Sequence, residues 1–172
     1  HLIGPDGVGE ARRGMTIGRL RAALPPGTVL GPPEPFMVDV AGLPVVRGAD
    51  TLYHVLVVSG EPGGDDAPVT LLATRNRSFR TAEGVGPGTT LGEASAAYGA
   101  ATLSYSTGDE SREYASFARF PHPGIRFRVE PGASASGTAG VYASEEEYNR
   151  TTEHDRSARI SLVLVDLRPA TE

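Results

Sequence analysis

The chain contains 172 residues and carries a formal net charge of −5, with 39% hydrophobic and 22% charged residues. This composition is ordinary for a globular protein with a full core, and it argues against wholesale disorder. The acidic balance argues against a nucleic-acid-binding protein, whose surface is usually basic. The longest apolar runs, HVLVV and ISLVLV, are far shorter than the roughly 18 residues that a transmembrane helix needs. We therefore expect a water-soluble chain with no membrane span and no nucleic-acid partner.

Two residue types are missing from the sequence. It has no cysteine, which excludes disulfides, thiol catalysis and thiolate metal sites. It also has no lysine, so all sixteen basic residues are arginine. Because the sequence starts at His1 rather than at a methionine, an N-terminal segment has been cleaved, trimmed or left out. We expect an extracytoplasmic location, which would be periplasmic, secreted or fixed by a lipid anchor outside the given residues. A cytoplasmic location is the alternative.

Two similar phrases predict two short helices. GMTIGRLRAAL begins at Gly14 and GTTLGEASAAY begins at Gly88, and five of their eleven positions are identical. In each phrase the apolar residues fall on one helical stripe, and a breaker follows, Pro25 in the first and Gly99 in the second. Thr90 and Glu93 also match the capping box that closes a helix start, whereas the first phrase lacks it. We expect two helices of about ten residues.

Each predicted helix is followed by strand-like segments that are rich in Val, Ile, Phe and Tyr and separated by Gly/Pro turns. These segments are FMVDVAG, TLYHVLVVSG and PVTLLATR after the first helix, and ATLSYS, REYASFARF, GIRFRVE and ARISLVLVDL after the second. EPGGDDAP is expected to form a hairpin loop. This order predicts an α+β fold, a tandem repeat of a short helix followed by an antiparallel β-meander, with the helices packed on sheet faces. The expected halves are residues 1–81 and 82–172.

The phrase G-[MT]-T, followed by a hydrophobic residue and a short helix, resembles a motif of bacterial envelope domains. These are the β-lactamase-inhibitor-protein-like modules and the related small outer-membrane-assembly lipoproteins. The resemblance implies a helix packed on one face of an antiparallel sheet, a unit that the inhibitor carries twice. The chain departs from this pattern because it has no cysteine for the inhibitor's disulfides or for a lipobox. The resemblance therefore implies a fold and supplies no site residue.

The arginines of the second half suggest a site for a protein partner. Strand alternation in IRFRV places Arg126 and Arg128 on one face of the predicted sheet, with Arg119 as a candidate neighbour and Phe117 nearby. Arginine and aromatic residues are favoured at protein interfaces. The leading hypothesis is thus a non-enzymatic binding protein that recognises a protein through this face. The competing interpretation is an ordinary solvated face.

An alternative site is a small-anion or phosphoester-binding cluster. Arg75, Arg77 and Arg80 precede a Gly-rich turn that contains Thr89 and Thr90 and opens onto the second helix. Free N–H groups at a helix start and guanidinium groups both favour an anion. The stretch lacks the phosphate-loop pattern, however, and a tight strand-to-helix turn would use the same glycines.

The segment at about 131–156 is predicted to be an insertion between the last two strands. It is a candidate functional loop or merely a tolerated one, and Ser144 with Glu147 could cap a short exposed helix. Its acidic residues lack the spacing of a calcium loop, and the histidines lack that of a metal site. The sequence also has no G-x-S-x-G elbow. We expect no metal, no cofactor and no enzymatic activity.

Overall fold

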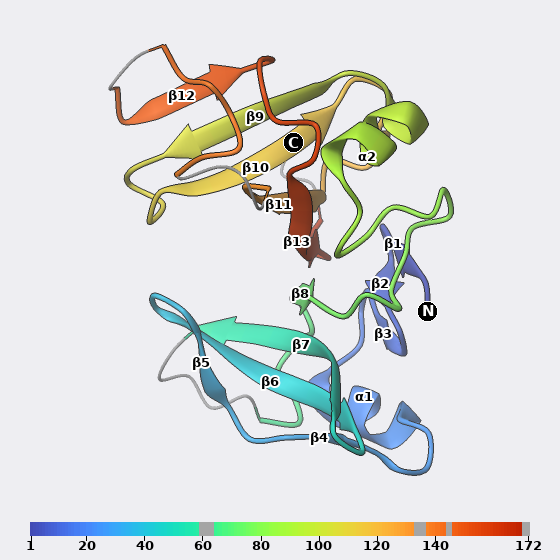
Figure 1. Cartoon of the computed structure of the whole chain (residues 1–172). Helices are drawn as coiled ribbons and strands as arrows, with labels where there is room; N and C mark the ends of the chain where they lie inside the picture. Colours follow the sequence, from blue (N-terminus) through green and yellow to red (C-terminus); the bar gives the residue numbers. More distant parts are fainter. Residues whose placement is uncertain (59–63, 133–136, 144–145, 170–172) are drawn as a thin grey trace.

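One antiparallel sheet of ten strands forms the framework of the fold (Figure 1). The structure is a computed structural model that describes residues 1–58, 64–132, 137–143 and 146–169. Nine strands follow one another across the sheet in the order β12-β9-β10-β11-β13-β8-β7-β6-β4, and β5 also pairs with β6. Their bounds are β4 Thr28–Leu30, β5 Glu34–Met37, β6 Val40–Arg47, β7 Asp50–Val58, β8 Leu71–Thr74, β9 Ala101–Ser106, β10 Arg112–Phe117, β11 Ile125–Glu130, β12 Tyr148–Thr151 and β13 Arg159–Asp166.

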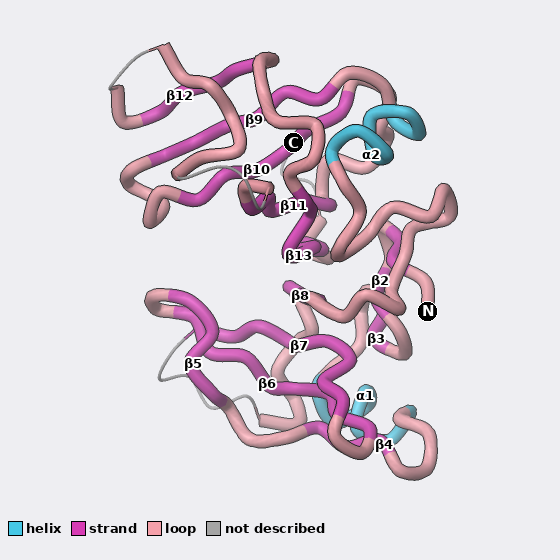
Figure 2. Tube along the Cα trace, viewed as in Figure 1, coloured by secondary structure: helices cyan, strands magenta, loops and turns pink. Residues whose placement is uncertain are grey.

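The expected fold class was wrong, because the described chain is a β-rich fold rather than a tandem helix-plus-meander α+β repeat. Its two described helices, α1 (Ile17–Ala23) and α2 (Leu91–Tyr98), contain only seven and eight residues, and Figure 2 shows how small a share of the chain they form. The strands that follow both helices enter one continuous sheet, which is joined where β8 pairs with β13. This pairing links residues about 90 positions apart, which no local sequence pattern reveals. The division at residue 81 remains a prediction.

Both helices begin where the sequence predicts, and the two starts are built alike. The hydroxyls of Thr16 and Thr90 accept the N–H groups of Arg19 and Glu93, and only Thr90 forms the full capping box. Other free N–H groups at each start are satisfied by a passing backbone segment. In α2, Leu91 and Gly92 donate to the carbonyls of Ala158 and Arg156 at 2.8 and 2.9 Å. This pairing fixes each helix against the chain that enters a central strand.

The second glycine of each phrase provides room for that passing segment. Gly18 donates its N–H to the Asp65 carbonyl at 2.8 Å, and a Cβ at Gly18 would lie 2.8 Å from the Asp65 Cβ. A Cβ at Gly92 would lie 3.3 Å from the Arg156 carbonyl oxygen, which is a looser approach. The shared glycines therefore reflect close backbone packing rather than a phosphate-binding loop.

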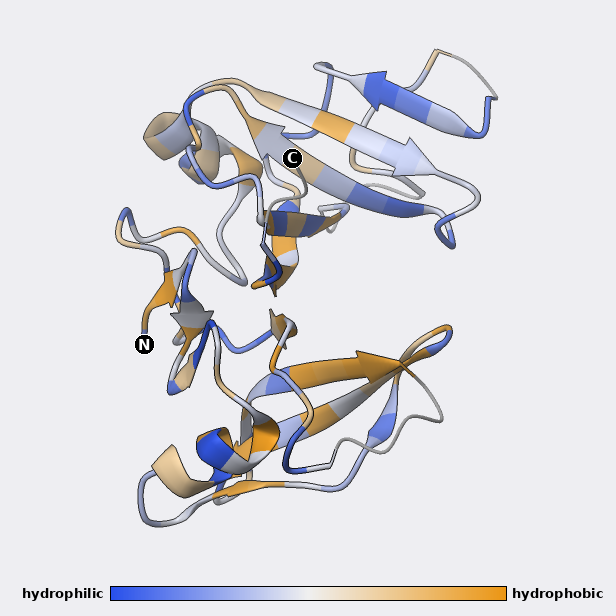
Figure 3. Ribbon diagram, turned by 180° about the vertical axis from the view of Figure 1, so that it is seen from behind, coloured by the Kyte–Doolittle hydropathy of each residue, from blue (hydrophilic) through white to orange (hydrophobic). Residues whose placement is uncertain are grey.

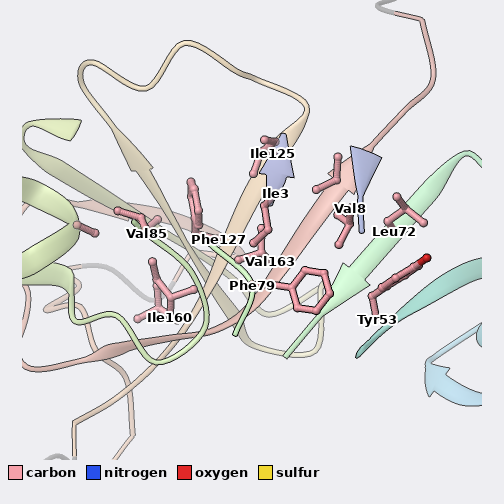
Figure 4. Close-up of a cluster of buried hydrophobic side chains, with 14 of the residues drawn as sticks. Ile3, Val8, Tyr53, Leu72, Phe79, Val85, Ile125, Phe127, Ile160 and Val163 are labelled. Carbon is pink, nitrogen blue, oxygen red and sulfur yellow. The ribbon is translucent and has the colours of Figure 1, made fainter. Parts of the chain in front are cut away.

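The main core lies on the face of the sheet that carries both helices. Apolar residues from α1 and α2, including Ile17, Leu20 and Leu91, are fully buried against the sheet. A small three-stranded sheet at the N-terminus packs against the same core through Ile3 and Val8. This sheet was not predicted from the sequence. Its strands are β1 Ile3–Gly4, β2 Gly7–Val8 and β3 Ala11–Arg12. Figure 4 shows these side chains beside core residues of the central strands.

Six of the seven predicted strand segments correspond to observed strands. The seventh, FMVDVAG, contains the end of β5, a turn at Val38 and Asp39, and the start of β6. Two further regions also differ from expectation. The strand β4 was not predicted, and β12 occupies part of the segment expected to be a short helix or loop. The capping residue proposed there, Ser144, lies outside the described residues, as does part of the EPGGDDAP hairpin loop. No helix among the described residues is long and apolar enough to cross a membrane.

Replacing Gly18 by alanine is expected to lower the free energy of unfolding by about 1–3 kcal/mol, because the new Cβ would collide with Asp65. At an unobstructed helix position the same change stabilises by about 1 kcal/mol. Urea unfolding measures the difference. Gly92→Ala is the matched control, and its looser approach to Arg156 predicts a clearly smaller loss. A Gly18→Ala chain as stable as the parent would contradict this account.

Candidate binding face of the sheet

The face of the sheet opposite the helices, here called the outer face, is identified by the strand register. Tyr114 on β10 lies opposite Arg128 on β11, which in turn lies opposite Leu162 on β13. Residues directly opposite one another in antiparallel strands point to the same face. In Figure 1 the sheet bends at β8 and β13, so that β9 and β10 form an upper arm and β5, β6 and β7 a lower arm, with both helices and the small sheet on the other side.

A buried apolar strip forms the middle of the outer face. Leu162, Leu164 and Ala73 on the two central strands are at most 4% exposed, and Leu56 on β7 is 3% exposed. They form a second cluster with Tyr114, and partly buried side chains pack against it, namely Phe36, Met37, Val40 and Leu71. The strip is thus covered by side chains of the sheet's own strands. The lower arm contributes most of this apolar surface, and Figure 3 shows β7 mainly hydrophobic and β12 mainly hydrophilic.

Arginines stack on aromatic rings on both arms. The Arg126 guanidinium carbon lies 3.9 Å from the centre of the Tyr114 ring, and that of Arg75 lies 4.6 Å from the centre of the Phe36 ring. Such cation–π contacts hold a guanidinium in place without neutralising it. Arg128 is half-buried on the same face, directly opposite Tyr114. The pKa of Arg75 is lowered, first by burial and then by the positive charge of Arg128. Within the described ranges, none of the three arginines forms an ion pair.

His54 on β7 lies on the outer face of the lower arm. His54 Nε2 donates to Glu34 Oε1 at 3.0 Å, and the imidazole also packs against the Phe36 ring, with 4.8 Å between ring centres. Burial lowers the pKa of His54, and the bond to Glu34 opposes this effect only in part. The imidazole is therefore mainly neutral at pH 7, and positive charge on the outer face comes from the arginines.

The upper arm contains a hollow where β10 and β11 separate. The two strands are paired only from Glu113 to Ala115, whereas β10 stays paired with β9 as far as Phe117 and β11 with β13 as far as Ile125. A cavity of about 480 Å³ lies at this separation. Its lining combines core side chains, Phe117, Phe120, Ile125 and Phe127, with outer-face groups, among them Arg126, Ser104, Ser116 and Tyr148.

The residues predicted to bind a protein partner do not all lie on the same surface of the structure. Arg126 and Arg128 share the outer face, as the alternation indicates. Phe117 is 7% exposed and belongs to the core, so it does not lie on the face with the arginines. Arg119 is exposed in the turn after β10, and its side chain lies beside Gly99 at the end of α2. The sequence missed the partners on the lower arm, because Phe36 and Arg75 reach this face only through pairing with distant strands.

The residues predicted to bind a small anion also do not all lie together. Arg75 and Arg77 line a hollow of about 270 Å³ together with Arg159, Gly88 and Glu130. Three further residues lie elsewhere or are already engaged: Arg80 donates to the carbonyls of Phe79 and Pro87, the Thr89 hydroxyl accepts from Gly86, and Thr90 caps the helix. The first N–H groups of α2 are bonded to protein atoms and are not free for an anion.

The segment at 131–156 is anchored by a carboxylate that the sequence analysis did not single out. Glu113 on β10 is 4% exposed and accepts bonds from the backbone N–H groups of Ala139 and Gly140 at 2.6 and 2.9 Å, and from the Tyr142 hydroxyl at 2.8 Å. Burial, followed by the hydrogen bond to Glu113, raises the pKa of Tyr142. Three donors thus compensate the buried carboxylate.

The described acidic residues of the segment at 131–156 do not form a cluster that could bind a metal ion. Glu145 lies outside the described residues, and no group of three or more His, Asp or Glu side chains that could hold a metal ion occurs in the part of the chain that the structure describes.

Comparisons with known proteins give information on the fold of the chain and not on its function. No family model matches the sequence, and no curated protein matches it significantly. Among solved structures, the chain is similar to the uncharacterized protein yfeY from Escherichia coli, with a TM-score of 0.57 and 12% sequence identity. The similarity covers 96% of this chain and 99% of the other. At this identity the two proteins share an architecture, and the resemblance to the inhibitor-like envelope modules stays a prediction.

Replacing Glu113 by glutamine is expected to lower the free energy of unfolding by about 1–3 kcal/mol, because an amide offers one acceptor oxygen and turns a donor toward buried N–H groups. Amide hydrogen exchange at Ala139 and Gly140 should accelerate. Tyr142→Phe is the control, since it removes one bond only and should cost about 1 kcal/mol. Unchanged exchange in the Glu113→Gln chain would show that the carboxylate does not anchor this segment.

Proposed function

We propose that the chain is a non-enzymatic binding protein that recognises a protein partner through the outer face. The observation that carries this proposal is the pair of arginine–aromatic stacks, Arg126 on Tyr114 and Arg75 on Phe36, on either side of a buried apolar strip. Arginine and aromatic residues dominate the energetics of protein interfaces, and a stacked guanidinium loses little freedom when it binds.

The chemistry of the face favours an acidic partner with apolar side chains. The chain as a whole is acidic, yet Arg75, Arg126 and Arg128 concentrate positive charge on this surface, and Glu130 offsets the charge of Arg75 only in part. Long-range attraction would steer a negatively charged partner to it. The lower arm would meet the partner's apolar groups through Phe36 and Met37, which are only partly buried. An extracytoplasmic location is part of this proposal, and fractionation of the producing cells tests it.

The charge-reversed chain Arg126→Glu, Arg128→Glu is expected to lose its partner while keeping its fold. With the tagged chain as bait in an extract of the producing organism, the partner is identified, purified and titrated. Reversal of two central charges should weaken binding by at least about 30-fold. The melting temperature should change by no more than about 4 °C, because Arg126 is exposed, Arg128 is half-buried, and loss of the stack on Tyr114 costs about 1 kcal/mol.

The matched control reverses two arginines on the opposite side of the molecule, Arg19→Glu and Arg21→Glu, which are exposed on α1. This chain should bind the partner like the parent. Binding should also weaken as salt rises, since exposed charges are screened. Equal affinity of the outer-face variant and the parent for the purified partner would refute the proposal.

A second candidate is a small-anion or phosphoester-binding protein, favoured by one observation. Arg75, Arg77 and Arg159 line the hollow beside Gly88 together with Glu130. Arg159 also donates to the Gly88 carbonyl at 2.7 Å. Three guanidinium groups around a small hollow suit a phosphate group. The start of α2, which the sequence suggested as part of this site, is closed by backbone bonds and takes no part.

Inorganic phosphate tests this second candidate by thermal shift. At about 100 times its dissociation constant, a ligand stabilises the folded chain by roughly 2.7 kcal/mol. The double variant Arg77→Gln, Arg159→Gln should lose this stabilisation, whereas Arg19→Gln should keep it. No phosphate-dependent shift in the parent chain, or an equal shift in the double variant, would exclude the anion site.

A further inference from the structure

We infer that the hollow between the separated ends of β10 and β11 is a binding site for a small carboxylic acid with an aromatic or branched aliphatic body. Its volume of about 480 Å³ falls within the range of small-molecule sites. The site lies in the upper arm and takes a free small molecule, so it is distinct from protein recognition by the whole outer face.

The separation of the two strands opens the core to the outer face. Because β10 and β11 stop pairing after Ala115 and Phe127, no ladder closes the sheet between Ser116 and Arg126. Three phenylalanine rings lie behind this opening, and Phe127 contacts the other two: Phe117 and Phe120 lie 5.6 and 5.0 Å from it between ring centres. These edge-on rings offer an apolar floor that fits a flat ring or a branched chain.

The rim carries one permanent cation. Arg126 is exposed, and its stack on Tyr114 holds the guanidinium at the mouth of the hollow. The remaining polar lining consists of hydroxyls, Ser104, Ser116 and the two tyrosines, and of His122, and no carboxylate lines the hollow among the residues that the structure describes. A guanidinium presents paired N–H donors that match a carboxylate. The charge and shape of the lining therefore complement a monoanionic acid with its body toward the phenylalanines.

A titration followed by two-dimensional NMR tests the site, with 3-phenylpropionate as the probe. The amides of Ala115, Ser116 and Phe127 should shift and saturate, with a dissociation constant of about 1 mM or tighter. Two further probes separate the contributions: 3-phenylpropionamide lacks the charge, and propionate lacks the ring. Each should bind at least about tenfold more weakly than the parent acid.

Two variants test which arginine binds the carboxylate of the probe. Arg126→Gln should weaken binding of 3-phenylpropionate by roughly 10- to 100-fold, because a charge-assisted bond is lost. Arg128→Gln is the matched control, since Arg128 lies two residues away on the same strand and face but does not line the hollow. It should bind the acid like the parent chain.

A third variant, Ser116→Phe, fills the hollow from an exposed position on β10 and should abolish binding of the acid and the amide alike. No saturable shift with 3-phenylpropionate overturns the inference, and so does equal binding by Arg126→Gln. Retained binding in a folded Ser116→Phe chain would mean that the acid meets only the surface cation, which also overturns it. The measurement uses the isolated chain, so its outcome is independent of the protein-partner proposal.

Discussion

The antiparallel pairing of β8 with β13 joins the two halves of the main sheet, and the arrangement of the rest of the structure depends on it. Four residue pairs, from Val163–Thr74 to Asp166–Leu71, join the strands that follow α1 to those that follow α2. On one side of this seam Leu72, Val163 and Val165 enter the main core, and on the other side Ala73 and Leu164 form the strip of the outer face. Since both faces of the sheet are buried along this pairing, water is excluded from the ladder that holds the halves together.

This seam also creates the candidate site. The strands that carry Arg126 and Phe36 are far apart in the sequence, and only the continuous sheet brings their arms to the same face. The two arms differ in character, because the lower arm is apolar around Phe36 and Met37 whereas the upper arm carries Arg126 and several hydroxyls. A surface with these two sides suits a partner that has both acidic and apolar groups.

Much of the local structure follows from the sequence for reasons that act over a few residues. Thr90 and Glu93 satisfy each other's backbone groups, so the start of α2 could be predicted to the residue. Alternation of side chains correctly placed Arg126 and Arg128 on one face and Phe127 on the other. The same reasoning could not place Phe117, because its face depends on how β10 pairs with β9, and it lies in the core.

The sequence by itself determined the positions of both short helices, six of the thirteen described strands and the absence of thiol chemistry, because caps, periodicity and composition are local properties. The tertiary structure alone decided that the chain is one β-rich sheet rather than a helix-plus-meander repeat, since strand pairing across about 90 residues leaves no local trace. It also decided that Glu113 is a buried anchor and that Arg75 shares a face with Arg126. Both depend on segments that meet only after folding, where burial and charge are set by neighbours distant in the sequence.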